Sequence, residues 1–201
     1  MKIDESLASE IGVALNEATL LGAEYSPAMN AVGLTFSVLT LPDDTAPEPD
    51  DPRRQIILSD IGRLAGVLST RHADPLSAVV KPFSVSDLLP VVASFGGQAI
   101  YGWDFINGDD HSFSKWRHNL SVDHKPREGS LENRIFLFQE GAADDRVLDL
   151  WIWFSDFIVR DAEGSTIPLD RFVADGKRWW DALYGQDPRT RGHGIVPGSA
   201  S

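Results

Sequence analysis

Two apolar runs joined by a short polar turn constrain the fold of this chain more than any other feature. The runs are LENRIFLFQ and RVLDLWIWF, and residues 140–145 form the turn between them. In the second run the side chains alternate with the period of two that is typical of a β-strand. One face is apolar and the other carries two tryptophans: Leu148, Leu150, Ile152 and Phe154 against Asp149, Trp151 and Trp153. The pattern predicts a hairpin whose second strand is central in its sheet.

Further strands are predicted on both sides of this hairpin. They are rich in β-branched and aromatic residues and are bounded by turn-forming residues, at 31–41, 55–68, 100–105, 157–160 and 165–167. Gly62 and Gly66 interrupt the second of these runs and predict a bulge, or a bend where the backbone passes close to another element. Together the segments predict a meander of antiparallel hairpins.

The two ends of the chain show helical spacing. Near the N-terminus apolar residues recur at intervals of three or four and Gly22 follows as a helix end, so we predict a helix within residues 1–22. After Pro168 the helical pattern resumes with Asp170 as a candidate N-cap. Residues 185–201 are expected to form a flexible tail that either extends along the surface or frays. Because no segment separates two cores, the 201 residues predict a single α+β domain, a mainly antiparallel sheet packed against N- and C-terminal helices.

Residues 42–54, PDDTAPEPDDPRR, are here called the acidic loop. Four prolines and five carboxylates in this stretch exclude a helix and a central strand. The simplest interpretation is a solvated connection between two antiparallel strands. The alternative is a docking element for a basic partner.

The charge of the chain limits its partners. Its 30 Asp and Glu against 18 Lys and Arg give a net charge of −12, which repels nucleic acid and anionic membrane surfaces. The chain has no cysteine, and its first residues, MKIDESLASEIGVALNEATLL, lack the positive start and apolar stretch of a signal peptide. We therefore expect a cytoplasmic protein that binds neither nucleic acid nor membranes.

No arrangement of residues in the sequence predicts a catalytic or metal site. The five histidines lack the paired spacings of metal-binding motifs, and His111 and His118 lie seven residues apart, two turns of a helix. Gly-x-Ser-x-Gly is absent. The glycine runs Gly96-Gly97 and Gly192-His193-Gly194 lack the strand–loop–helix setting of phosphate-binding loops. We predict no cofactor, no bound metal and no catalytic residue.

The aromatic residues are the most unusual part of the composition, with six tryptophans in the chain. Most of them are expected in the core, because a sheet packed against a helix needs bulky side chains at the contact. The alternative is that some line an exposed groove, since tryptophan and tyrosine are favoured in binding sites. In that case Trp153 or Trp180 is partly exposed to solvent.

Four segments form a recognisable set: QAIYGWDF, LDLWIWF, IPLDRFV and KRWWDALYGQDPRTRGHGIVP. They resemble segments of a family of small, acidic, uncharacterised bacterial proteins, mainly actinobacterial, and the likeness extends from about Tyr25 onward. The resemblance implies a bacterial cytosolic setting. It implies no mechanism and no catalytic residues.

The function class that these observations favour is a non-enzymatic binding protein, immunity-like or regulatory, for a basic protein partner. Small size, strong negative charge and the acidic loop support it, because complementary charge speeds association and gives specificity. The candidate contacts lie in the acidic loop, with two tryptophans as possible anchors: Asp43, Asp44, Glu48, Asp50, Asp51, Trp103 and Trp153.

The alternative class is a small-molecule-binding protein or a hydrolase. Its pocket is expected between the aromatic face of the sheet and the C-terminal helix. The candidate pocket residues are Asp104, His111, His118, Asp149 and Trp180. A third interpretation is an architectural subunit of a larger assembly.

Overall fold

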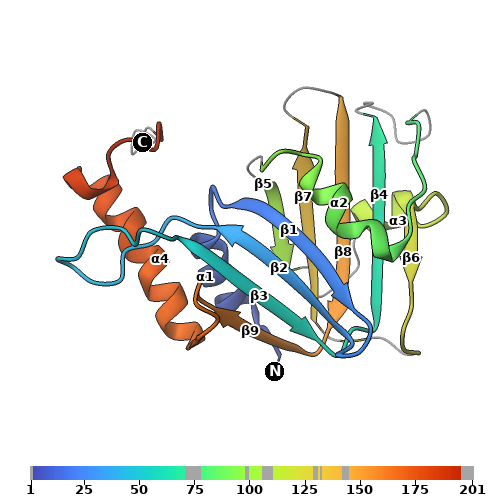
Figure 1. Ribbon diagram of the computed structural model, residues 1–201, viewed down its shortest axis with the longest axis horizontal. Coiled ribbons are helices and arrows are strands. Elements are labelled where there is room, and N and C mark those ends of the chain that lie inside the picture. The colour runs from blue at the N-terminus through green and yellow to red at the C-terminus, as the bar shows by residue number, and fades with distance from the viewer. Residues whose placement is uncertain are drawn as a thin grey trace.

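The described residues form two antiparallel sheets of five strands each, with helices at one end and along the edges (Figure 1). This confirms the predicted α+β class. The strands form two sheets, however, and not one continuous meander. The computed structural model describes residues 2–70, 78–97, 100–105, 111–128, 131, 133–141 and 145–195.

The first sheet takes strands from both halves of the chain. In spatial order they are β1 (Thr19–Ser26), β2 (Ala31–Ser37), β3 (Arg53–Ser59), β9 (Asp156–Arg160) and β10 (Thr166–Ile167). Alternate residues of β2 face inward: Val32, Leu34 and Phe36 are fully buried. The hairpin of β9 and β10 is as predicted, and β9 also pairs with β3, Ile158 beside Ile57.

The second sheet contains the hairpin on which the prediction was based. Its strands, in order, are β5 (Ile100–Phe105), β7 (Asn133–Glu140), β8 (Arg146–Phe154), β4 (Arg63–Thr70) and β6 (Val122–His124). β8 pairs with β7 on one side and with β4 on the other, which confirms it as a central strand. Leu150 and Ile152 face the core, while Trp151 packs on the other face against Phe113 and Phe136.

The main hydrophobic core lies between the two sheets. It joins the inward faces of β1, β2, β3 and β9 to those of β4, β7 and β8, and it includes Ile11 and Leu15 at the N-terminal end. Burying this apolar surface is the dominant favourable contribution to folding, at roughly 25 cal/mol per Å². A smaller cluster, Leu41 with Trp179, Trp180 and Leu183, lies apart from it.

Two strands leave one sheet for the other at the same place. β3 passes into β4 through Asp60–Gly62, and β8 passes into β9 at Ser155. The backbone N–H of Ser155 donates to the Ser59 carbonyl at 3.1 Å, and that of Gly62 donates to the Trp153 carbonyl at 3.0 Å. The predicted bend in residues 55–68 is therefore confirmed, although the segment is two strands and not one.

Gly66 marks the close backbone approach that the sequence predicted. A Cβ at this position would lie 2.8 Å from Leu150 Cδ2 and 3.2 Å from the carbonyl oxygen of Asp149. Only glycine fits there without movement of β8.

The helices are α1 (Glu5–Ala14), α2 (Leu88–Ala93), α3 (His111–Trp116) and α4 (Leu169–Tyr184), and short 3-10 turns occupy Val85–Asp87 and Pro188–Thr190. α1 packs against α4, which lies at the end of the molecule away from the second sheet (Figure 1). At their contact a Cβ on Gly176 would lie 2.6 Å from Ala14 Cα. None of the described helices is long and apolar enough to cross a membrane.

The N-terminal helix is shorter than predicted. α1 ends at Ala14, and Gly22 lies inside β1, where an added Cβ would lie 3.2 Å from Leu89 Cδ1. The helical spacing continued past the true end because Ala18 and Leu20 are also buried, but as alternate residues of the chain entering β1. Between helix and strand, Glu17 has a left-handed backbone with φ 59°, in the turn that leads from the end of α1 into β1.

The C-terminal segment also departs from the prediction. Pro168, and not Asp170, is the N-cap of α4, and Asp170 lies in its first turn. Residues 185–195 are not a free tail: Thr190 is buried, and Ile195 packs against the small cluster of α4. The sequence of this segment shows no helical or strand periodicity, because polar contacts and not a stripe of apolar side chains hold it in place. Residues 196–201 lie outside the described part of the chain.

Candidate functional site

The acidic loop joins β2 to β3, as predicted, although its last two residues, Arg53 and Arg54, already belong to β3. The loop projects beside α4 at one end of the molecule (Figure 1). Two arginines from the C-terminal region hold it in place. Arg178 donates to the Leu41 carbonyl at 2.7 Å and pairs with Asp44 at 3.0 Å. Arg189 donates to the carbonyls of Asp43 and Ala46 at 3.1 and 3.0 Å. The loop therefore has a fixed shape, although it has no regular secondary structure.

Carboxylates within the loop and its neighbour segment also form local contacts. Asp43 accepts from the backbone N–H groups of Ala46 and Thr45, and these bonds lower its pKa. Asp51 forms a two-point contact with Arg53, which lowers the pKa of Asp51 to about 2. Asp187 has a lowered pKa for the same reason, its hydrogen bonds to Arg189.

These shifts predict that acid weakens the anchoring of the loop. The unfolded pKa of aspartate is about 3.9, and each folded value is lower, so ionised Asp43, Asp51 and Asp187 stabilise the fold above that pH. The contribution is lost as the pH falls through the folded pKa, which for Asp51 is about 2. We expect Asp51→Asn to flatten the dependence of the unfolding free energy on pH in this window, measured by urea denaturation. Equal slopes in variant and wild type would contradict the assignment.

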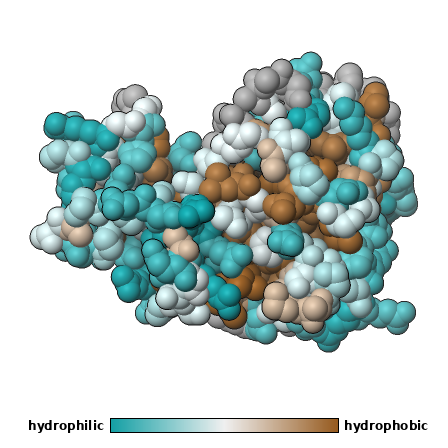
Figure 2. Space-filling view, viewed as in Figure 1, coloured by the Kyte–Doolittle hydropathy of each residue, from teal (hydrophilic) through white to brown (hydrophobic). Residues whose placement is uncertain are grey.

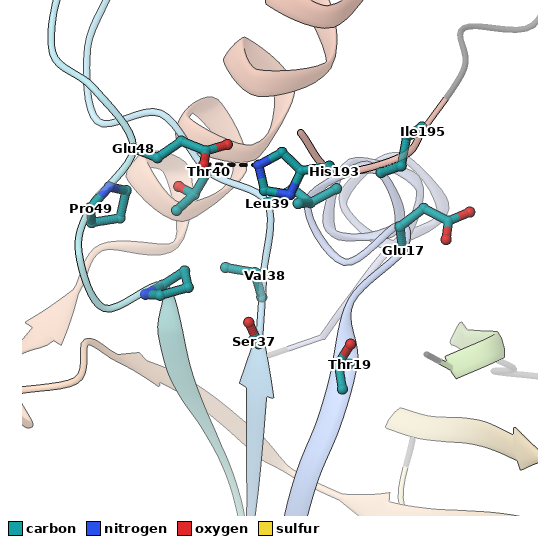
Figure 3. A pocket seen from close by; sticks show the side chains of 11 residues that line it. Glu17, Thr19, Ser37, Val38, Leu39, Thr40, Glu48, Pro49, His193 and Ile195 are labelled. Carbon is teal, nitrogen blue, oxygen red and sulfur yellow. Dashed lines mark hydrogen bonds and ion pairs between the residues drawn. The ribbon is translucent and has the colours of Figure 1, made fainter. Parts of the chain in front are cut away.

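A pocket of about 290 Å³ opens behind the loop (Figure 3). Its wall is formed by the ends of β1 and β2, by the loop and by the C-terminal segment. The polar lining residues are Glu17, Thr19, Ser37, Thr40, Glu48 and His193. Apolar surface comes from Val38, Leu39, Pro49, Pro52 and Ile195.

Glu48 is the best-anchored polar group of this pocket. One carboxylate oxygen accepts from the indole Nε1–H of buried Trp179, and the other lies 2.9 Å from His193 Nε2. The ring of His193 also meets that of Trp179 edge to face, with centroids 5.3 Å apart. Because an ionised carboxylate only accepts, His193 Nε2 is the donor, and Nδ1 of the neutral ring is then an acceptor.

Thr40 adds a hydroxyl to the same wall. The residue is 4% exposed and lines the pocket, and among the described residues its side chain has no hydrogen-bond partner. A hydroxyl without a protein partner at the wall of a pocket can bond to a ligand or water that enters the pocket. The pocket therefore offers one carboxylate fixed in position, one imidazole acceptor and one unpaired hydroxyl.

The candidate partner residues are only partly brought together. Asp43, Asp44 and Asp50 are exposed on the loop, while Glu48 and Asp51 are half-buried by their contacts with His193 and Arg53. Trp153 is not near the loop: it lies on β8 between Phe113, at 5.1 Å, and the guanidinium of Arg63, at 5.3 Å. The side chain of Trp103 lies outside the described residues.

The alternative pocket residues are dispersed where they are described. Asp149 is buried on β8, whereas Trp180 belongs to the separate cluster on α4, so the aromatic face of β8 does not meet the C-terminal helix. α3 lies on that face instead, through Phe113. His118 is exposed and accepts from Arg117 at 3.0 Å. The side chains of Asp104 and His111 lie outside the described part of the structure.

A second hollow, of about 400 Å³, lies on the open face of the first sheet. It is floored by Gly33 and Ile57 and flanked by the exposed side chains of Met29 and Leu89. Figure 2 shows hydrophobic residues gathered over this part of the molecule, whereas the end with α4 and the acidic loop is mainly hydrophilic. The two surfaces therefore differ in the chemistry that they offer.

Sequence reasoning missed Glu17, Thr40 and His193, which line the pocket behind the loop. It also missed Trp179 and Arg189, which bond to Glu48 and to the backbone of the loop. One signal was available, since the segment PRTRGHG carries two arginines and a histidine and complements the acids of residues 43–51. No protein-family model, curated protein or solved structure gives a significant match to the chain.

Proposed function

We propose that this protein is a non-enzymatic binding protein for a basic protein partner, and that the acidic loop is the element that the partner recognises. The observation that carries the proposal is the one-sided anchoring of the loop. Arg178 and Arg189 hold its backbone carbonyls from the side of α4, while the Asp44 side chain stays 91% exposed and Asp50 also faces solvent.

A loop held in this way is suited to association. Its shape is already set, so the partner orders fewer groups on binding, and that ordering cost is one of the main penalties of association. The net charge of −12 attracts a basic protein over a distance of about one Debye length, roughly 8 Å at physiological salt. The sequence resemblance implies a bacterial cytosolic setting, and small size, negative charge and the acidic loop favour an immunity-like or regulatory role there.

The internal ion pairs of the loop do not oppose this role. Asp44 pairs with Arg178 in an exposed position, and such a pair contributes at most about 1 kcal/mol. Asp44 can therefore exchange Arg178 for a cation of the partner at small cost. Asp50 has no ion pair among the described residues, so its charge is available at once.

The test is capture from the cytosol of the source organism at low salt with three forms of the protein. We expect the wild type to recover a stoichiometric basic protein, and Asp44→Asn with Asp50→Asn to reduce its recovery by about threefold to tenfold, because two exposed charges are lost. Glu5→Gln with Glu10→Gln is the matched control, since it makes the same charge change on the exposed side of α1.

The control variant should recover the partner as the wild type does. Equal losses with the two double variants would show that net charge alone is recognised, and would overturn the role of the loop. Recovery of no stoichiometric partner would overturn the binding function as a whole.

A further inference from the structure

We propose that the pocket behind the acidic loop binds an alkylammonium or guanidinium group, held by Glu48 and Thr40. The inference rests on the proposed function where the group is a lysine or arginine of the partner, and it stands alone where the group belongs to a free small amine. The shared chemistry is a hydrogen-bond-donating cation on an aliphatic stem.

The charge of the pocket selects a cation over an anion. Two carboxylates line it, Glu48 from the loop and Glu17 from the turn before β1, on opposite sides of the opening (Figure 3). The neutral imidazole of His193 donates to Glu48 through Nε2. Its other nitrogen, Nδ1, is then an acceptor, and the ring adds no positive charge to the pocket. An anion placed there would meet two like charges, whereas a cation gains from both.

The hydrogen-bonding groups point to a ligand that donates. An ionised carboxylate offers about four acceptor positions, and Glu48 uses two of them, for Trp179 and His193. The hydroxyl of Thr40 has no hydrogen-bond partner among the described residues, so its oxygen can accept a hydrogen bond from the ligand. Ammonium and guanidinium groups have donors only, so they complement this set, and hydrogen bonds to charged groups are the stronger ones.

The shape and apolar lining suit an aliphatic stem. Val38 is buried at the back of the pocket, and the rings of Pro49 and Pro52 stand on the loop side. Lysine and arginine bury their methylene chains along such surfaces while the charged head finds polar partners. A volume of about 290 Å³ accommodates a side chain of this size and not a large cofactor.

The probe for the experiment is n-butylammonium, titrated into the full-length protein and followed by the indole N–H signal of Trp179 in heteronuclear NMR. That signal is assigned with Trp179→Phe. Trp179 reports on the site because its indole N–H bonds to Glu48. We expect saturable shifts in the millimolar range, as for a fragment-sized ligand. Tetramethylammonium, which has the charge but no N–H, is the matched probe and should give no saturable shift.

Three variants test the residues. Thr40→Val keeps the shape and removes the hydroxyl, and we expect roughly tenfold weaker binding of n-butylammonium. Glu17→Gln should weaken binding about threefold through the lost charge. Glu24→Gln makes the same charge change at an exposed site on the open face of the first sheet and should leave the affinity unchanged. None of these three removes a contact of Trp179 or Glu48, so the fold is retained.

The outcomes separate the two proposals. Absence of a saturable shift, or equal shifts with tetramethylammonium, overturns the proposal that the pocket binds an ammonium or guanidinium group. The proposed binding of a basic partner is then still tested by the loop variants. If Thr40→Val also weakens partner capture, the bound group is a side chain of the partner. If capture is unchanged by Thr40→Val while n-butylammonium still binds, the pocket takes a free amine, and Asp44→Asn with Asp50→Asn should not alter that binding.

Discussion

Replacing Gly176 by alanine should destabilise the protein by about 2 kcal/mol, although alanine is the better helix former by about 1 kcal/mol. The added Cβ would lie 2.6 Å from Ala14 Cα and 2.7 Å from Ala14 Cβ. Backbone atoms cannot rotate away, so α1 and α4 must separate and lose packing along their contact. Urea denaturation followed by far-ultraviolet circular dichroism measures the loss.

Gly33→Ala is the control for this prediction. Its Cβ would meet only Gln55 Nε2, at 3.4 Å, which is the far end of a flexible side chain. We expect a change within about 0.5 kcal/mol, since alanine is slightly preferred to glycine inside a strand. A Gly176→Ala variant as stable as wild type would show that the helices do not depend on this close approach.

Truncating Trp179 to alanine should cost about 3 to 5 kcal/mol, the largest effect that we expect from one side chain near the pocket. The indole is fully buried with Leu41, Trp180 and Leu183, and it donates to Glu48. Its loss opens a cavity and also removes the donor that holds Glu48. We therefore expect the acidic loop to lose order together with the stability of α4.

Trp179→Phe reduces the cavity while removing the indole N–H, because it keeps one aromatic ring in place, and Trp180→Phe matches its loss of volume. We expect a cost of about 1 to 2 kcal/mol, and faster hydrogen exchange at the Ala46 amide, which bonds to Asp43 inside the loop. Trp180→Phe is the matched control: its indole Nε1 is buried without a hydrogen-bond partner among the described residues. If both variants change Ala46 exchange equally, the bond from Trp179 to Glu48 does not hold the loop.

Much of the fold could be predicted where apolar residues recur at one regular spacing over a long segment. β8 alternates over nine residues, and its faces, its central position and its partner strand followed from that alternation. The end of α1 could not be predicted, because buried Ala18 continues the helical spacing of Ile11 and Leu15 and also alternates with Leu20 as in a strand. The division into two sheets was hidden as well, since pairing such as Ile57 with Ile158 depends on contacts distant in sequence.

The candidate site was predictable only in part. The carboxylates of the acidic loop could be recognised from composition, and Asp43, Asp44 and Asp50 are exposed there. Which carboxylate faces a pocket could not be seen, because Glu48 is distinguished by Trp179 and His193, which lie more than a hundred residues further along the chain. Segments without a regular spacing of apolar residues, such as residues 185–195, are held by hydrogen bonds of arginine side chains. Such contacts produce no recognisable pattern in the sequence.

The shared corner where β3 passes into β4 and β8 passes into β9 has a consequence for the order of assembly. On the ribosome, β3 and β4 emerge with the edges that later receive β9 and β8 still unpaired. The second sheet is incomplete until β8 has been synthesised as far as Phe154, and the first sheet until β9 and β10 follow. The nascent chain therefore exposes strand edges for most of its translation. The excess of acidic residues gives incomplete chains a negative charge, and their mutual repulsion opposes aggregation through the exposed strand edges.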